Sequence, residues 1–183
     1  MRVPRTFVFV DLGGFTNYTA SHGDDAAGAI LSTFRAIARE VASERGVRIA
    51  KWLGDGCMIV AVDQPDAVAA TLELEHRCRR AVRPLNLRAG LATGYALLFE
   101  GDDYIGSAVN LAARLCDVAG PWEVLAPAAI AAELPVGVVA QPHGTIDLRG
   151  FPEAMEVVEL SGDVEPKERN DTGELWTRSP FVA

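Results

Sequence analysis

Cysteine is scarce in this chain of 183 residues, where only Cys57, Cys78 and Cys116 occur. Their number is odd, they lie far apart, and no Cys-X-X-Cys pair is present. We therefore expect neither a disulfide framework nor a cysteine-based zinc site. Reduced thiols in a cytosolic protein are the simplest interpretation.

Long apolar runs are missing as well. No stretch approaches the roughly 18 apolar residues that a membrane-spanning helix needs. The apolar start of the chain is too short for a signal peptide, and Asp11 interrupts it. These absences predict a cytoplasmic protein with no segment in the membrane.

Positive charge is the third shortage, because 17 Lys and Arg stand against 25 Asp and Glu, for a net charge of −8. A general basic surface for nucleic acid is therefore not expected. A nucleotide substrate remains compatible with this charge, since divalent metal ions can bind a triphosphate beside carboxylates.

The hydrophobic pattern predicts one α+β domain, with short apolar runs as strands and helical periodicity as helices. The expected strands cover residues 6–11, 47–53, 57–62, 87–93 and 95–100, and the expected helices cover 24–44, 65–82 and 105–118. Further short strands (122–126, 136–140, 144–148 and 155–160) and a helix at 127–132 follow. This order is that of a ferredoxin-like βαββαβ palm with additional C-terminal strands and a small helix.

The composition changes near residue 161, beyond which the sequence is polar, charged and weakly patterned. We therefore expect a folded domain over residues 1–161. Residues 162–183 are expected to form a C-terminal extension.

Two aspartates stand at the ends of predicted strands. Asp11 ends the first strand, and Asp55 lies at the tip of a hairpin whose turn reads Gly-Asp-Gly. In a βαββαβ sheet these positions can meet at one edge, where a divalent cation would relieve the repulsion between the carboxylates. From spacing alone, two unrelated turn aspartates would give the same pattern.

Asn110 and Arg114 are four residues apart on a predicted helix and share a face. Such a pair can hold a ribose and a phosphate, and a solvated helix face is the alternative.

Lys51 is unusual in a mostly apolar strand, and alternation places it on the side of Leu53 and Asp55. Trp52 is expected on the opposite side.

Five segments, taken in order, resemble the catalytic domain of the class III nucleotidyl cyclases, in the adenylyl form found as stand-alone bacterial enzymes. They are FVDLGGFT (9–16), KWLGDG (51–56), LRAGL (87–91) with Gly94, DYIGSAVN (103–110) with Arg114, and LRGF (148–151). Each motif is weak alone, whereas their joint order over about residues 5 to 160 is specific.

The resemblance implies that Asp11 and Asp55 hold two divalent ions, Mg²⁺ or Mn²⁺. It implies that Arg114 stabilises charge on the α-phosphoryl oxygens, that Asn110 orients the ribose, and that Arg88 binds the outgoing phosphates. The expected reaction is the conversion of ATP to 3′,5′-cyclic AMP and pyrophosphate. The histidines His22, His76 and His143 match no role in this family.

Lys51 and Asp103 are the residues that, by the same resemblance, read the base. Lysine only donates and ionised aspartate only accepts, which suits N1 and the 6-amino group of adenine. Guanylyl cyclases of the family usually carry Glu at the position of Lys51. A guanylyl or relaxed-specificity cyclase, and a catalytically silent nucleotide-binding or dimerisation module, are the alternatives.

The resemblance also implies assembly, because in this family one domain supplies the two aspartates and another supplies the remaining groups. This chain carries both sets. We therefore expect a two-fold homodimer with two shared sites, each built from Asp11 and Asp55 of one chain and Lys51, Asp103, Asn110 and Arg114 of the other.

Overall fold

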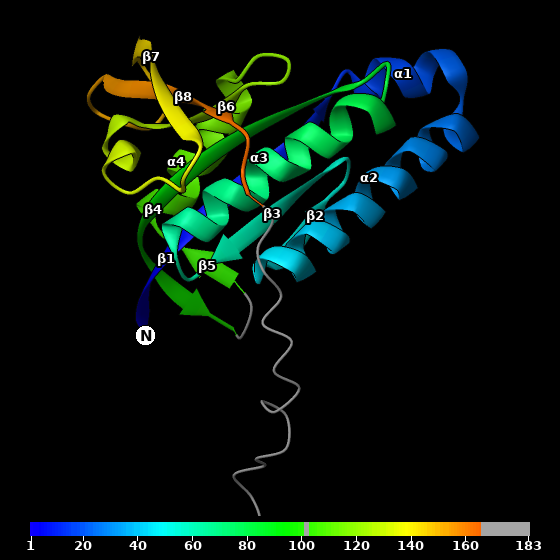
Figure 1. The fold of residues 1–183 in the computed structure, drawn as a ribbon. Coiled ribbons are helices and arrows are strands. Elements are labelled where there is room, and N and C mark those ends of the chain that lie inside the picture. Colours follow the sequence, from blue (N-terminus) through cyan, green and yellow to red (C-terminus); the bar gives the residue numbers. More distant parts are fainter. Residues whose placement is uncertain (101–102, 166–183) are drawn as a thin grey trace, which may run out of the picture.

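The computed structural model describes residues 1–100 and 103–165, which form one sheet with helices on both faces (Figure 1). The strand order is β2 (Arg48–Leu53), β3 (Gly56–Ala61), β1 (Arg2–Gly13), β4 (Asn86–Phe99), β6 (Val124–Pro127), β8 (Met155–Gly162) and β7 (Val138–Ile146). A short strand, β5 (Asp103–Ile105), pairs with the end of β4. The predicted α+β palm with additional C-terminal strands is confirmed.

The helices divide between the two faces of the sheet. α2 (Asp24–Arg45) and α3 (Gln64–Ala81) lie side by side over one face, and α4 (Ser107–Val118) covers the other (Figure 1). Alternation along β1 produces this arrangement, since Val8, Val10 and Leu12 belong to the core under α2 and α3, while Phe7 and Phe9 belong to the core under α4. Two further helical segments are α1 (Phe15–His22) and η1 (Ala128–Ala132).

Glycine allows α4 to lie directly on the backbone of β4. A Cβ atom at Gly90 would lie 2.3 Å from both the Ala112 carbonyl oxygen and the Cys116 nitrogen. At Gly94 it would lie 2.9 Å from the Cβ atom of Ala108. These absent side chains bring the helix, with its polar residues, close to the middle of the sheet.

Two expected strand pairs are single strands in the structure. Residues 86–99 form one continuous β4, because Gly94 makes room for α4 and does not open a turn. The hairpin partner of β4 is β5, whose residues were expected at or before the start of a helix. Likewise, β7 continues from Val138 to Ile146 with an irregularity between Pro142 and Gly144.

β8 is the last strand of the described residues, and it reaches Gly162, one residue beyond the expected domain boundary. Most of the expected C-terminal extension, residues 166–183, lies outside the described residues. Among the helices of the described part, none is both long and apolar enough to cross a bilayer.

Candidate active site

Asp11 lies directly opposite Arg88 on the neighbouring strands β1 and β4. The Arg88 guanidinium donates from Nε and Nη2 to Asp11 Oδ2, at 2.9 and 2.7 Å. Its Nη1 donates to the main-chain oxygen of Asp117 at 3.2 Å. The strand register therefore joins an acidic and a basic residue of the expected site into one cross-strand pair.

Asp55 occupies the turn between β2 and β3, beside the same part of β1. A Cβ atom at Gly56 would lie 2.2 Å from the Val10 carbonyl oxygen and 3.3 Å from the Asp11 Cα atom, so the turn is packed against the β1 backbone. Burial raises the pKa of the Asp55 carboxyl, and the nearby charge of Asp11 raises it further. Two carboxylates that act on each other in this way suit a divalent cation, which prefers oxygen ligands.

Arg114 approaches Asp11 from α4. The two residues line a hollow of about 290 Å³, together with Leu53, Arg88 and Asp117. Arg114 Nη1 donates to Asp117 Oδ2 at 2.7 Å, so each arginine of this hollow is engaged by an aspartate. The hollow therefore brings acidic and basic groups together at a size that suits part of a nucleotide.

Asn110 lies one turn before Arg114 on α4. Its side chain is exposed and is not among the residues that line this hollow. The helix therefore presents Asn110 and Arg114 on one side, but only Arg114 approaches Asp11 within a single chain.

Lys51 and Asp103 form an ion pair, although they come from β2 and β5. Lys51 is opposite Met58, which belongs to the core on the α4 face, so the pair lies on the face that carries Asp11 and Arg114. Trp52 takes the other side and packs against the core under α2 and α3. Lys51 and Asp103 do not line the hollow at Asp11.

The sequence interpretation missed Asp117, which binds Arg114 with its carboxylate and Arg88 with its main-chain oxygen. Its position three residues after Arg114 was an available signal, since such residues share a helix face.

His143 was assigned no role, yet it lies near Glu123 and Glu159, with one potential ligand atom from each within 4.8 Å of the others. Glu123 immediately precedes β6, His143 lies in β7 and Glu159 in β8, so this group is separate from the hairpin of Asp55, and exposed acidic groups of this kind are common without an ion.

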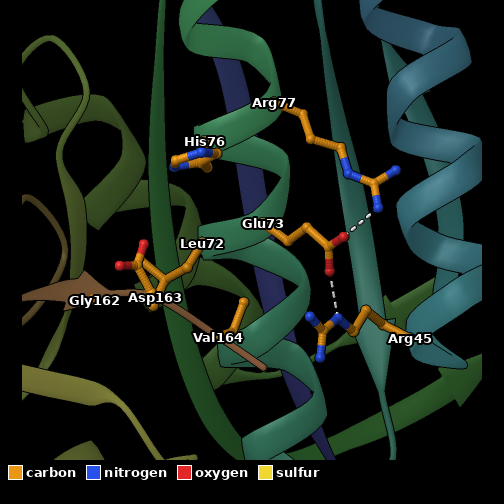
Figure 2. Close-up of a pocket in the computed structure, with 8 residues that line it drawn as sticks. All are labelled: Arg45, Leu72, Glu73, His76, Arg77, Gly162, Asp163 and Val164. Carbon is orange, nitrogen blue, oxygen red and sulfur yellow. Dashed lines mark hydrogen bonds and ion pairs between the residues drawn. The ribbon is translucent and has the colours of Figure 1, made fainter. Parts of the chain in front are cut away.

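Another hollow, of about 210 Å³, lies over α3 on the opposite face (Figure 2). Figure 2 shows Glu73 between Arg45 and Arg77, and its carboxylate accepts from both, at 2.5 Å from Arg45 Nε. Arg77 also contacts Glu44 of α2. These ion pairs hold α2 against α3, and their charges are matched within the protein, so we do not assign the site here.

The curated relatives include nucleotide cyclases. The chain is 37% identical over 153 residues to an uncharacterised protein of Mycobacterium tuberculosis, covering 83% of this chain and 40% of that one. It is 33% identical over 126 residues to an adenylate cyclase of Streptomyces coelicolor, covering 69% and 33%. No protein-family model matches the chain. The chain spans well under half the length of these relatives.

Solved structures extend the likeness to the whole fold. The adenylyl cyclase CyaB from P. aeruginosa superposes with a TM-score of 0.78 at 24% identity, covering 91% of this chain and 97% of that one. The guanylyl cyclase Cya2 superposes with a TM-score of 0.78 at 20% identity, covering 92% and 96%. The chain thus has the structure of a class III adenylyl/guanylyl cyclase catalytic domain, as the sequence resemblance predicted. Since enzymes of both base specificities superpose equally well, the fold leaves the nucleotide open.

Proposed function

We propose that the chain is an adenylyl cyclase that converts ATP to 3′,5′-cyclic AMP and pyrophosphate, with residues 1–161 as its catalytic domain. The observation that carries this proposal is the closeness of the Asp55 turn to Asp11, beside the hollow that Asp11 and Arg88 line. Carboxylates for cations and arginines for phosphates are the two components that phosphoryl transfer needs. The 33% identity over 126 residues to an adenylate cyclase of Streptomyces coelicolor supports this proposal.

Asp11 and Asp55 would hold two divalent ions, Mg²⁺ or Mn²⁺. When bound, such ions neutralise the triphosphate and lower the pKa of a coordinated hydroxyl. In the reaction, the ribose 3′-hydroxyl gives up its proton to solvent water and its oxygen bonds to the α-phosphorus, while the bond from that phosphorus to pyrophosphate breaks. A second copy of the chain supplies the groups that act on the reacting phosphate and ribose. Its Arg114 stabilises the charge that develops on the α-phosphoryl oxygens, and its Asn110 holds the ribose in line for attack.

Arg88 binds the outgoing phosphates in this proposal, in addition to its bond to Asp11. Its guanidinium is permanently charged and only partly buried, so it can turn from the carboxylate to the outgoing phosphates when the nucleotide arrives. Binding of the nucleotide and release of Asp11 are then coupled at a single side chain.

Lys51 and Asp103 select adenine in this proposal. Their ion pair supplies a donor and an acceptor side by side, which matches N1 and the 6-amino group of adenine. Guanine presents the opposite pattern, a donor at N1 and an acceptor at O6, and would leave both groups badly paired. A polar site of this kind can discriminate strongly between bases.

The active form is proposed to be a homodimer with two shared sites. Each chain carries both sets of groups, and neither Asn110 nor the Lys51–Asp103 pair lines the hollow at Asp11, so a second copy supplies them together with its own Arg114. The Arg114 of the same chain stays bound to Asp117. The β4–β5 hairpin also presents an exposed apolar face of the kind that interfaces cover. It consists of Tyr95, Leu97, Phe99 and Ile105, which are 69%, 37%, 45% and 55% exposed.

The proposal is tested by incubating the purified chain with Mn²⁺ and either ATP or GTP, and by measuring cyclic nucleotide and pyrophosphate. We expect cyclic AMP and pyrophosphate in equal amounts, little cyclic GMP, and loss of both products with EDTA or with Asp55→Asn. Equal turnover of GTP would favour a relaxed-specificity cyclase. Absence of product at protein concentrations that give a dimer would favour a silent nucleotide-binding module.

A further inference from the structure

The turn that carries Asp55 is tied to helix α2 by one side chain. Arg35, in the middle of α2, donates from Nη2 to the main-chain oxygen of Gly54 at 2.9 Å. Gly54 immediately precedes Asp55 and has a φ of 68°, a left-handed conformation that favours glycine. The hydrogen bond therefore reaches the turn at the residue next to the carboxylate.

Aromatic packing fixes the position of the Arg35 guanidinium. Its Cζ atom lies 5.0 Å from the centroid of the Trp52 ring, and Phe34 packs edge-on against the same ring at 6.3 Å. Arg35 Nε is buried and has no hydrogen-bond partner among the described residues. A cation held over an aromatic face in this way has little freedom, so its bond to Gly54 is directed.

Arg39 shares the contact with Trp52 but not the hydrogen bond to Gly54. It lies one turn further along α2, with its Cζ atom 5.1 Å from the same Trp52 centroid. None of the hydrogen bonds recorded within residues 1–100 and 103–165 joins it to Gly54. Of the two arginines that the described residues place over Trp52, only Arg35 donates a hydrogen bond to Gly54.

The far side of the turn is held by the sheet. Gly56 packs so closely on β1 that a Cβ atom there would lie 2.2 Å from the Val10 carbonyl oxygen. Asp55 is therefore placed between two anchors, the β1 backbone at Gly56 and the α2 side chain at Gly54. Removing the Arg35 contact leaves the turn held by the β1 backbone and by the β2–β3 pairing of Leu53 with Gly56.

We propose that Arg35 is a positioning residue for the cation-binding half of the site, because it holds Gly54 and so fixes where Asp55 meets Asp11. The inference rests on the proposed function insofar as it concerns cation binding and turnover. Arg35 contacts neither carboxylate in this arrangement and acts through the backbone of the turn. Outer groups that orient ligand residues commonly change cation affinity or activity by about 10- to 100-fold when removed.

The test compares Arg35→Ala, Arg35→Lys and Arg39→Ala with wild type in the full chain. Hydrogen exchange of the peptide covering residues 53–57, measured without metal or nucleotide, reports the turn itself. The Mn²⁺ concentration for half-maximal activity at saturating ATP, and KM for ATP at saturating Mn²⁺, report the consequence. Circular dichroism melting shows that each variant is folded.

For Arg35→Ala we expect faster exchange of the turn and about a 10-fold higher Mn²⁺ requirement, with KM for ATP within about twofold of wild type. Arg35→Lys keeps the charge but loses the planar fork, so both readouts should fall between those of wild type and Arg35→Ala. Arg39→Ala should match wild type in both. If Arg35→Ala fails to fold, Arg35→Lys decides the matter by the same readouts.

Unchanged exchange in the Arg35 variants, or equal effects of Arg35→Ala and Arg39→Ala, would overturn the inference. A wild-type chain that makes no cyclic nucleotide would instead overturn the proposed function. In that case the exchange measurement still decides whether Arg35 holds the turn, so the two failures are distinguishable.

Discussion

Arg88 and Asp11 form a cross-strand pair in which two N–H groups of the arginine bind a single carboxylate oxygen, at 2.9 and 2.7 Å. A cation thus occupies one oxygen of an aspartate that the proposed function assigns to metal binding. A divalent ion that approaches Asp11 must compete with this guanidinium, unless phosphate oxygens draw Arg88 away.

Arg88→Ala should therefore have two opposite effects. The Mn²⁺ concentration for half-maximal activity should fall, because Asp11 is freed, while KM for ATP should rise because a phosphate contact is lost. Each change should be about 10-fold, as expected for one hydrogen-bonded charge. Steady-state kinetics over a grid of Mn²⁺ and ATP concentrations separates the two effects, with Arg2→Ala on the exposed start of β1 as the control. A variant in which neither parameter moves would show that Arg88 is only structural.

Lys51→Glu should abolish the preference for adenine without unfolding the domain. The substitution places two carboxylates together at the base-reading position, and we expect kcat/KM for ATP to fall by about 100-fold. The side chains of Lys51 and Asp103 are 44% and 48% exposed, so the ion pair contributes at most about 1 kcal/mol to stability. Kinetics with ATP and GTP and a thermal melt are the measurements. Unaltered selectivity would mean that other residues read the base.

Gly90→Ala should loosen the helix that carries Asn110 and Arg114. The added Cβ would meet the α4 backbone at 2.3 Å, so the helix must move outward, at a cost of about 1–3 kcal/mol in the free energy of unfolding. Urea unfolding measures this cost. Gly28→Ala is the matched control, because a Cβ at this exposed position in α2 meets nothing within 4 Å and should stabilise by about 0.5–1 kcal/mol. Equal effects of the two substitutions would contradict the close seating of α4.

Glu75 should make part of the stability depend on pH. Burial raises the pKa of its carboxyl, and Arg79, 2.5 Å away, opposes this shift without cancelling it. The folded state therefore binds this proton more tightly than the unfolded state, so the contribution of Glu75 to stability falls as pH rises from its ordinary pKa through the raised value. Glu75→Gln removes this effect.

The difference in unfolding free energy between Glu75→Gln and wild type should therefore grow in favour of the variant between about pH 4 and pH 7. Urea unfolding at several pH values within this range measures it, and the other carboxylates cancel in the difference. A difference that stays constant, or that changes in favour of wild type, would contradict the burial of this charge.

The sequence was sufficient to predict the elements that have clear patterns. β1 and β3 are apolar runs bounded by glycine and aspartate, and α2 shows helical periodicity that ends at Gly46. The sequence was misleading at Gly94, because a glycine between two apolar runs is typical of a turn. In the structure this glycine lies within β4 and makes room for Ala108 of α4. α1 was missed because it buries none of its residues and so leaves no apolar pattern.

The candidate residues of the site could be found in the sequence, but not how they bind one another. The Arg88–Asp11 pair depends on the register between β1 and β4, and register is a property of two strands together. The bond from Arg35 to Gly54 depends on how α2 packs over β2, which no local pattern encodes. Whether the assigned roles are correct stays a prediction.

Sharing of each site between two copies of the chain is tested most directly by mixing two inactive variants, Asp11→Ala and Arg114→Ala, under conditions that allow subunits to exchange. Half of the resulting dimers should be mixed, each with one intact site, so cyclic AMP formation should return to about a quarter of the wild-type rate. Recovery of this size would support the reaction, the roles of both residues and the shared site together. A mixture as inactive as its parents, while both variants remain folded and dimeric, would contradict the shared site.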